Sequence, residues 1–139
     1  MTVDEAFSAD LADGLVAAPE SHIVLAQWSD PGGEHDPPRF IAPLHVHHAD
    51  DEAWYVIEGA LVVRVGDRDV EVPAGGAVIV PRGTPHTYWN PGAGPTRYLL
   101  VMTPRIRSLI DALHALEERT PDAVSTVFAA HQSEYLGWP

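Results

Sequence analysis

Two stretches of the sequence decide the fold: HVHHADDEAWYVIEG at 45–59 and GGAVIVPRGTPHTYWN at 75–90. The first opens on a histidine pair, His45 and His47, and the second carries His86 directly after a turn rich in Pro and Gly. Both stretches contain short runs of β-branched and aromatic residues between turn-forming residues. Such runs indicate β-strands joined by tight turns.

Similar short apolar runs continue on both sides of these stretches, separated by Gly, Pro, Asn or Asp. Their regular spacing is typical of an all-β sandwich or barrel. The Gly66-Asp67 pair lies between two alternating segments and predicts a hairpin. The predicted strands lie within 21–28, 41–48, 52–59, 60–72, 75–83, 86–94 and 96–103.

After Thr103 the apolar period changes from that of strands to that of helices. Thr103 followed by Pro104 has the pattern of a helix start, and the apolar residues that follow predict an amphipathic helix of about 15 residues. Thr120 and Pro121 repeat the pattern and predict a second helix, which ends before Gly137. We expect the apolar faces of both helices to pack on the outside of the barrel or to close one end of it, with a dimer contact as the alternative.

The chain has 139 residues, which is close to the size of a single domain with one core. We expect an N-terminal arm at 1–20, a barrel at 21–103 and a C-terminal helical extension at 104–139. The arm is predicted to be loosely docked, because acidic residues interrupt its weak apolar pattern.

Composition excludes several classes of protein. The chain has no cysteine, so disulfide frameworks, zinc fingers and thiol redox centres are excluded, and any metal must be held by His, Asp or Glu. A formal net charge of −12 repels a phosphate backbone, so we expect no nucleic-acid or membrane partner. No apolar run approaches the length of about 18 residues that spans a bilayer, and the first residues are acidic where a signal peptide is basic. We therefore expect a cytoplasmic protein.

The histidines and one glutamate are the candidates for a metal site. Because side chains on a strand alternate between its faces, His45 and His47 project to one side and His48 to the other. Glu52 follows His47 closely enough for the next strand to bring its carboxylate to the same imidazole pair. Together with His86, these residues offer three imidazoles and one carboxylate, a set suited to Fe, Mn, Ni, Co, Cu or Zn with positions left open.

The spacing HxHx4Ex6G, from His45 to Gly59, resembles the first motif of the cupin superfamily, and Gx5PxGx2Hx3N, from Gly75 to Asn90, resembles its second. The first motif usually opens with a glycine before the histidine pair, whereas PPRFIAP at this place has none. The resemblance implies a single-domain cupin with a double-stranded β-helix, or jelly-roll barrel. It also implies that a divalent transition metal is held at the mouth of the barrel by His45, His47, Glu52 and His86.

Other residues are candidates for the walls of a substrate pocket. The alternation that turns Glu52 inward also turns Trp54 inward, where it lines a pocket for a flat organic ligand or serves as a core residue. Tyr88 lies two residues after His86 and therefore on the same face of the predicted strand, where it offers a phenol near the metal or packs in the barrel. Arg64 and Arg82 are candidates for anchoring an anionic substrate.

Since a fold does not fix a function, three hypotheses remain. The first is a metal-dependent dioxygenase acting on a flavonol-like or other small aromatic substrate, with Glu52 alternating between ligand and catalytic base; the tail EYLGWP at 134–139 is similar to that of the quercetinase-like branch. The second is a non-redox polyketide cyclase or isomerase, and the third is a non-catalytic small-molecule-binding module. We also expect a homodimer, because the exposed edges of jelly-roll sheets need to be covered.

Overall fold

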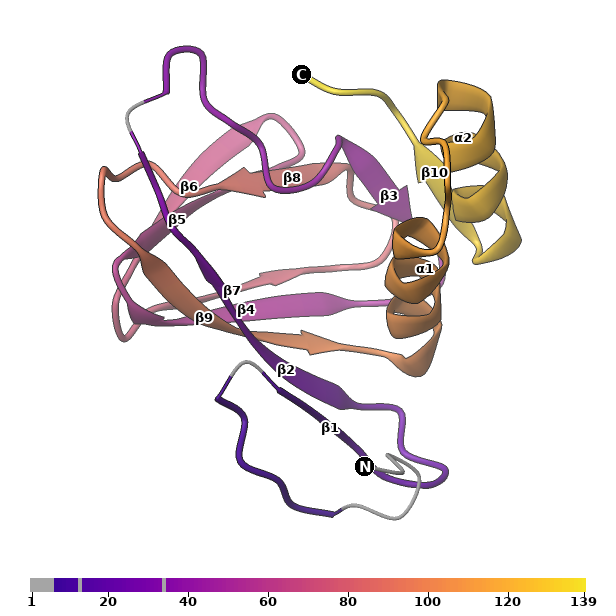
Figure 1. The fold of residues 1–139 in the computed structure, drawn as a ribbon, viewed down its shortest axis with the longest axis horizontal. Coiled ribbons are helices and arrows are strands. Elements are labelled where there is room, and N and C mark those ends of the chain that lie inside the picture. The colour runs from indigo at the N-terminus through magenta and orange to yellow at the C-terminus, as the bar shows by residue number, and fades with distance from the viewer. Residues whose placement is uncertain (1–6, 13, 34) are drawn as a thin grey trace.

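The structure is a computed structural model that describes residues 7–12, 14–33 and 35–139. These residues form two five-stranded antiparallel sheets, with strand orders β1-β2-β9-β4-β7 and β10-β3-β8-β5-β6. The elements of this described part are β1 (Leu15–Ala17), β2 (Val24–Asp30), β3 (His45–His47), β4 (Glu52–Glu58), β5 (Ala60–Val65), β6 (Arg68–Pro73), β7 (Ala77–Val80), β8 (His86–Trp89), β9 (Thr96–Met102), α1 (Pro104–His114), α2 (Pro121–Ala130) and β10 (Ser133–Tyr135). The two helices lie together beside one end of the facing sheets (Figure 1). The predicted all-β barrel with a two-helix extension is confirmed.

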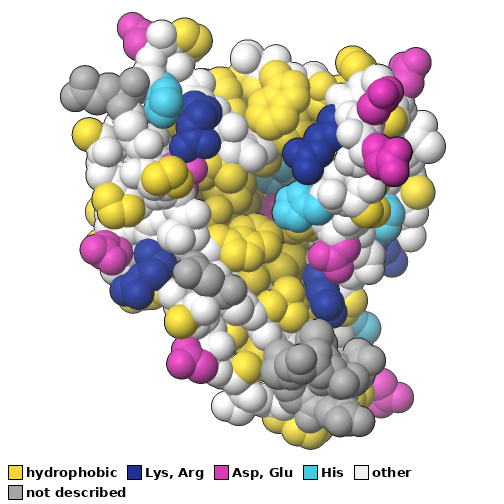
Figure 2. All heavy atoms as spheres, in the orientation of Figure 1, with side chains coloured by type: hydrophobic (Ala, Val, Ile, Leu, Met, Phe, Trp, Pro, Cys, Tyr) yellow, Lys and Arg dark blue, Asp and Glu magenta, His cyan; other side chains and the backbone are white. Residues whose placement is uncertain are grey.

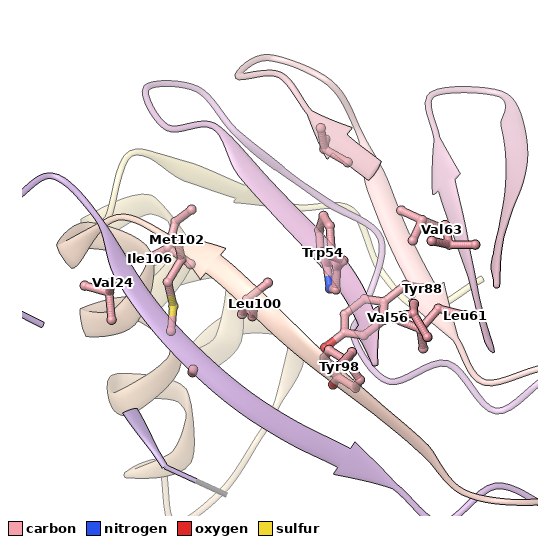
Figure 3. Close-up of a cluster of buried hydrophobic side chains, with 13 residues drawn as sticks. Val24, Trp54, Val56, Leu61, Val63, Tyr88, Tyr98, Leu100, Met102 and Ile106 are labelled. Atoms are coloured by element: carbon pink, nitrogen blue, oxygen red, sulfur yellow. Dashed lines mark hydrogen bonds between the residues drawn. The ribbon is translucent and has the colours of Figure 1, made fainter. Parts of the chain in front are cut away.

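The core lies between the two sheets and follows from alternation along the strands. In β9, Tyr98, Leu100 and Met102 are buried while the residues between them are only partly buried. Trp54 and Val56 of β4 face the same interior, as Figure 3 shows. Burying a side chain of this size stabilises the fold by about 1.5–3 kcal/mol. The inward parity predicted for Trp54 is therefore confirmed.

The predicted turns are present where the sequence places them. β5 and β6 pair as a hairpin around Gly66, and Gly59 and Gly83 have φ angles of +79° and +80°. Asn90 closes the loop after β8, since its amide nitrogen donates to the carbonyl of Gly94 at 3.0 Å. Glycine is the residue that adopts positive φ without strain, which explains its place in these turns.

Both helices begin as predicted. The hydroxyl of Thr103 accepts from the backbone N–H of Ile106, the third residue of α1, and the hydroxyl of Thr120 accepts from that of Ala123, the third residue of α2. α1 has 11 residues and is shorter than predicted, because Leu116 lies in the turn that follows it rather than on its last turn. No helix in the described part of the chain is long and apolar enough to cross a membrane.

The second helix ends before Gly137, as predicted, and a short strand follows it. α2 stops at Ala130, and Gln132 has a φ of +53°, which breaks the helical path. Residues Ser133–Tyr135 then form β10, which pairs with the edge of β3 that β8 leaves free. An unpaired strand edge presents backbone donors and acceptors, and β10 satisfies them. This strand is too short to be recognised from its sequence pattern.

The predicted arm contains one element of the first sheet. Strand β1 pairs antiparallel with β2, with Leu15 opposite Ala26. Residues 1–6 and 13 of the arm lie outside the described residues. The division of the chain into arm, barrel and extension stays a prediction.

Three large apolar side chains are exposed on or beside the first sheet. Ile23, Tyr55 and Ile79 are 56%, 43% and 68% exposed. Tyr55 and Ile79 belong to the neighbouring strands β4 and β7, so the sheet carries an apolar outer face. The homodimer expected from the sequence stays a prediction.

A pair of glycine variants tests the packing of the turn before β5. A Cβ on Gly59 would lie 2.6 Å from the carbonyl oxygen of Pro95, whereas nothing lies within 4 Å of a Cβ on Gly66. Both positions have positive φ, which strains an alanine by about 1–3 kcal/mol. We expect Gly59→Ala to lower the free energy of unfolding by about 2 kcal/mol more than Gly66→Ala in urea titrations, because overpacking adds to the strain. Equal losses would contradict this account of the turn.

Candidate metal centre

Four buried side chains from three strands converge at one end of the barrel. His45 and His47 come from β3, Glu52 begins β4 in the opposite sheet, and His86 begins β8. Each offers one ligand atom, and these atoms all lie within 4.8 Å of one another. The pairing of β3 with β8 places His45 directly opposite His86. The cluster predicted from the sequence spacing is therefore present.

Hydrogen bonds fix the orientation of all three imidazoles. The Nδ1 atoms of His45 and His86 lie 2.7 and 2.9 Å from the carbonyl oxygens of Pro43 and Thr84. Because a carbonyl only accepts, both Nδ1 atoms carry the proton and both Nε2 atoms present lone pairs.

The third imidazole is held in the same way by a side chain. The Nδ1 atom of His47 lies 2.8 Å from the hydroxyl of Ser133, and that hydroxyl donates its own proton to the carbonyl of His131. The Ser133 oxygen therefore accepts from His47, whose Nε2 is left to face the cluster. Partners of this kind orient the histidine ligands of metal sites in proteins.

The charges of the cluster suit a cation. Burial would raise the pKa of Glu52, but the neighbouring His47 and His86 outweigh burial and hold that pKa at about 2. Burial, together with the neighbouring His86 and His47, lowers the pKa of His45 to about 3. At neutral pH, Glu52 is thus a carboxylate and His45 a neutral imidazole, which are the forms that bind metal ions.

The contact between His86 and Glu52 tests whether these residues fit a metal. The Nε2 atom of His86 lies 3.0 Å from Oε1 of Glu52, although the ring already donates from Nδ1. In a neutral ring, this contact would set a lone pair against a carboxylate oxygen. Two ligands about 2.1 Å from one ion at a right angle are about 3 Å apart, so an ion bound by both groups accounts for their spacing. The donor set fits a divalent transition metal.

A cavity of about 470 Å³ opens from the cluster toward the solvent. His45, His47 and Glu52 line it, whereas His86 is only 1% exposed and does not. Most of the remaining wall is aliphatic or aromatic, and Figure 2 shows a hollow lined with apolar side chains on this face of the molecule. Apolar cavities with a few convergent polar groups are typical of small-molecule sites.

The C-terminal extension forms one wall of this cavity. Leu109 and Ile110 of α1 and Phe128 of α2 line it, and the Phe128 ring lies 5.4 Å from the His45 ring between centroids. Trp138, beyond β10, lines it as well. The two helices therefore close one end of the barrel, which is one of the positions predicted for them.

The two aromatic residues considered for the pocket differ in position. Tyr88 lines the cavity, and its hydroxyl lies 2.9 Å from that of Tyr98, which lines it too. Trp54 does not line the cavity: it is 1% exposed and packs behind Tyr88 and His86, with ring centroids 5.2 and 5.9 Å away. Of its two predicted roles, Trp54 therefore has that of a core residue.

The two arginines considered for anchoring an anion are already paired. Arg64 donates to Asp69 at 2.7 Å, and Arg82 donates to Asp51 at 3.0 Å. Neither lines the cavity described above, and their role as substrate anchors stays a prediction. His48 is half exposed and lies 3.4 Å from Glu134 rather than in the cluster, as its strand parity predicted.

Sequence reasoning missed several residues of this site, Tyr98 among them. Ser133, Phe128 and Arg119 come from the C-terminal segment, where helical periodicity gave no reason to place them near β3. The apolar stripe that includes Phe128 was recognised, but not its contact with a histidine of the cluster. Only the pairing of β10 with β3 brings Ser133 to His47.

Two histidine variants test the ligand set. We expect His86→Ala to lower the metal content of protein purified without chelators or nickel resin by about tenfold or more, because a ligand is lost. The matched variant His48→Ala removes an exposed imidazole and is expected to leave the metal content unchanged. Elemental analysis measures both. Equal losses in the two variants would contradict the assignment of strand faces.

A serine variant tests the orientation of His47. In Ser133→Ala, the Nδ1 proton of His47 loses its acceptor, and the metal is expected to bind about tenfold more weakly. The measurement is a competition titration with a chromogenic chelator. Ser133→Thr keeps the hydroxyl and should restore most of the affinity; unchanged affinity in the alanine variant would show that this contact does not orient the ring.

Two curated proteins are similar to part of the chain. TcmJ, a tetracenomycin polyketide synthase protein of Streptomyces glaucescens, is 38% identical over 60 residues, which are 43% of this chain and 40% of that protein. An uncharacterised protein of Methanocaldococcus jannaschii is 31% identical over 61 residues, which are 44% of this chain and 49% of that protein. The match thus spans less than half the length of either relative.

Solved structures and a family profile agree with the fold. A Klebsiella pneumoniae protein with a double-stranded β-helix domain superposes with a TM-score of 0.53 at 25% identity, covering 75% of this chain and 83% of that one. The profile of the cupin domain family matches residues 32–102, just over half of the chain, and this region includes all four residues of the cluster. The chain therefore belongs to the cupin domain family.

Proposed function

We propose that this cupin is a metal-dependent enzyme that acts on a small aromatic molecule of the polyketide or polyphenol type. The observation that carries the proposal is the opening of the cluster of three imidazoles and one carboxylate into a cavity with aromatic walls. Its volume of about 470 Å³ falls within the range of pockets that hold drug-sized ligands. The similarity to a polyketide synthase protein over 60 residues supports this substrate class.

The residues of the site have separate tasks in this proposal. His45, His47 and His86 would hold the ion through Nε2, and Glu52 would complete the set or take a proton from the substrate. A metal bound there supplies Lewis acidity toward a substrate oxygen and, where its oxidation state changes, redox chemistry with O2.

The tyrosine pair can donate a proton in a hydrogen bond to a substrate oxygen. Burial raises the pKa of Tyr98 to about 12 and raises that of Tyr88 well above its ordinary value. Both hydroxyls therefore stay protonated at neutral pH. One proton lies between the two oxygens, which are 2.9 Å apart, and the other remains for a ligand in the cavity.

We favour a non-redox reaction, either a ring closure or an isomerisation. In such a reaction a carbonyl group of the substrate is polarised and a proton is moved to or from the substrate. The position of Glu52 at the floor of the cavity, where a carboxylate can move a proton, supports this choice. The second candidate is dioxygenation of a flavonol-like substrate, which the donor set favours because nitrogen and oxygen ligands also hold Fe, Mn, Ni, Co and Cu.

Turnover by metal-restored protein distinguishes these reactions. The protein is incubated with a panel of poly-β-ketone and flavonol compounds, and product mass and oxygen uptake are followed together. A product with the mass of the substrate, or less one water, without oxygen uptake supports the cyclase or isomerase. A product that gains two oxygen atoms with matching oxygen uptake supports the dioxygenase.

A variant of the glutamate tests catalysis itself. We expect Glu52→Gln to lower kcat by about 100-fold or more, because the base is lost. His48→Ala, outside the cluster, serves as the control with unchanged kcat. If the protein binds these compounds but shows no turnover with any of the metals, it is a non-catalytic binding module, and the proposal is overturned.

A further inference from the structure

The arginines of this acidic chain are nearly all matched to carboxylates. The chain has 8 basic residues against 20 acidic ones, and every basic residue is an arginine. Six of these arginines lie within 4 Å of a carboxylate, namely Arg39, Arg64, Arg82, Arg97, Arg105 and Arg107. Within the described ranges, Arg68 and Arg119 form no such pair.

Arg119 is the unpaired arginine that lines the cavity of the metal centre. It lies in the segment between α1 and α2, and His114, at the end of α1, lines the cavity beside the same segment. Both side chains are exposed, whereas Glu52 at the other polar part of the wall is buried. The cavity therefore has a buried floor, formed by the metal-binding residues, and an exposed mouth, where Arg119 and His114 lie.

The negative charge of the whole molecule bears on the role of the Arg119 guanidinium. A formal net charge of −12 disfavours the approach of an anion to the molecule. Glu117 and Glu118 precede Arg119 in the chain, yet neither lines the cavity or forms an ion pair with it among the described residues. The guanidinium of Arg119 is therefore free to meet a negative group carried by the ligand.

We propose that the ligand of this cavity is an aromatic acid whose carboxylate lies at the mouth against Arg119. This inference rests on the proposed function and narrows its substrate class. The flat apolar body fills the space between Leu109, Ile110 and Phe128, and a phenol or carbonyl oxygen faces the floor. A guanidinium offers two parallel N–H donors that match the two oxygens of a carboxylate, and His114 is a second donor at the same rim.

If the proposal is correct, the cavity selects its ligands by charge as well as by shape. An acid and its primary amide have nearly the same size and planarity, so the apolar wall binds both alike. Only the acid gains the charge-assisted hydrogen bonds from Arg119. The preference for the acid should weaken as salt is added, because the mouth is exposed to solvent.

The experiment compares two probes on metal-loaded protein. The probes are a naphthoic acid with a phenolic hydroxyl at the far end of its ring system and the corresponding primary amide. Dissociation constants are measured by isothermal titration calorimetry. The variants are Arg119→Gln and, as a matched control, Arg68→Gln, which removes the other unpaired arginine from β6, outside the cavity.

We expect Arg119→Gln to weaken binding of the acid by about tenfold and to change binding of the amide less than twofold. Arg68→Gln should leave both unchanged. Equal losses for acid and amide, equal losses in the two variants, or no binding of the acid by the wild-type protein would each overturn the proposal. Because binding is read without turnover, and metal content is measured separately, a failure of catalysis does not imitate any of these results.

Discussion

The antiparallel pairing of β3 with its two neighbours is the interaction on which the site depends. β3 has only three residues, yet His45 lies opposite His86 on β8, and the other edge of β3 pairs with β10 from the end of the chain. A shift of one residue in this register would turn both histidines of β3 to the wrong face. Backbone hydrogen bonds on both edges therefore fix the positions of three imidazoles, and β4 adds Glu52 from the facing sheet.

The barrel and the cluster could be predicted because their signals are local. The spacing of His45, His47 and Glu52 follows from strand alternation, and the turns around Gly59 and Gly83 need the positive φ that glycine provides. The capping threonines of both helices are likewise read from adjacent residues. Each of these features depends on neighbours in the chain, so the sequence pattern contains them.

The remaining features depend on tertiary pairing and could not be predicted. Ser133 reaches His47 across 86 positions in the chain, and nothing in the sequence SEY distinguishes a strand from the end of a helix. The pairing of arginines with acids is equally non-local in some cases: Arg82 meets Asp51 from another strand's loop. Arg119, by contrast, stands out only when the partners of the other arginines are known.

The metal-binding residues and one wall of the cavity come from different parts of the sequence. Residues 45–86 supply the cluster, while α1, α2 and the tail through Trp138 supply the side chains that close one end of the barrel. Substitutions in this later segment, those at Phe128 and in β10 apart, change the shape and charge of the cavity without touching the cluster or its hydrogen-bond partners. Selection for a new ligand can therefore act on one stretch of the gene while the chemistry of the ion is conserved by another.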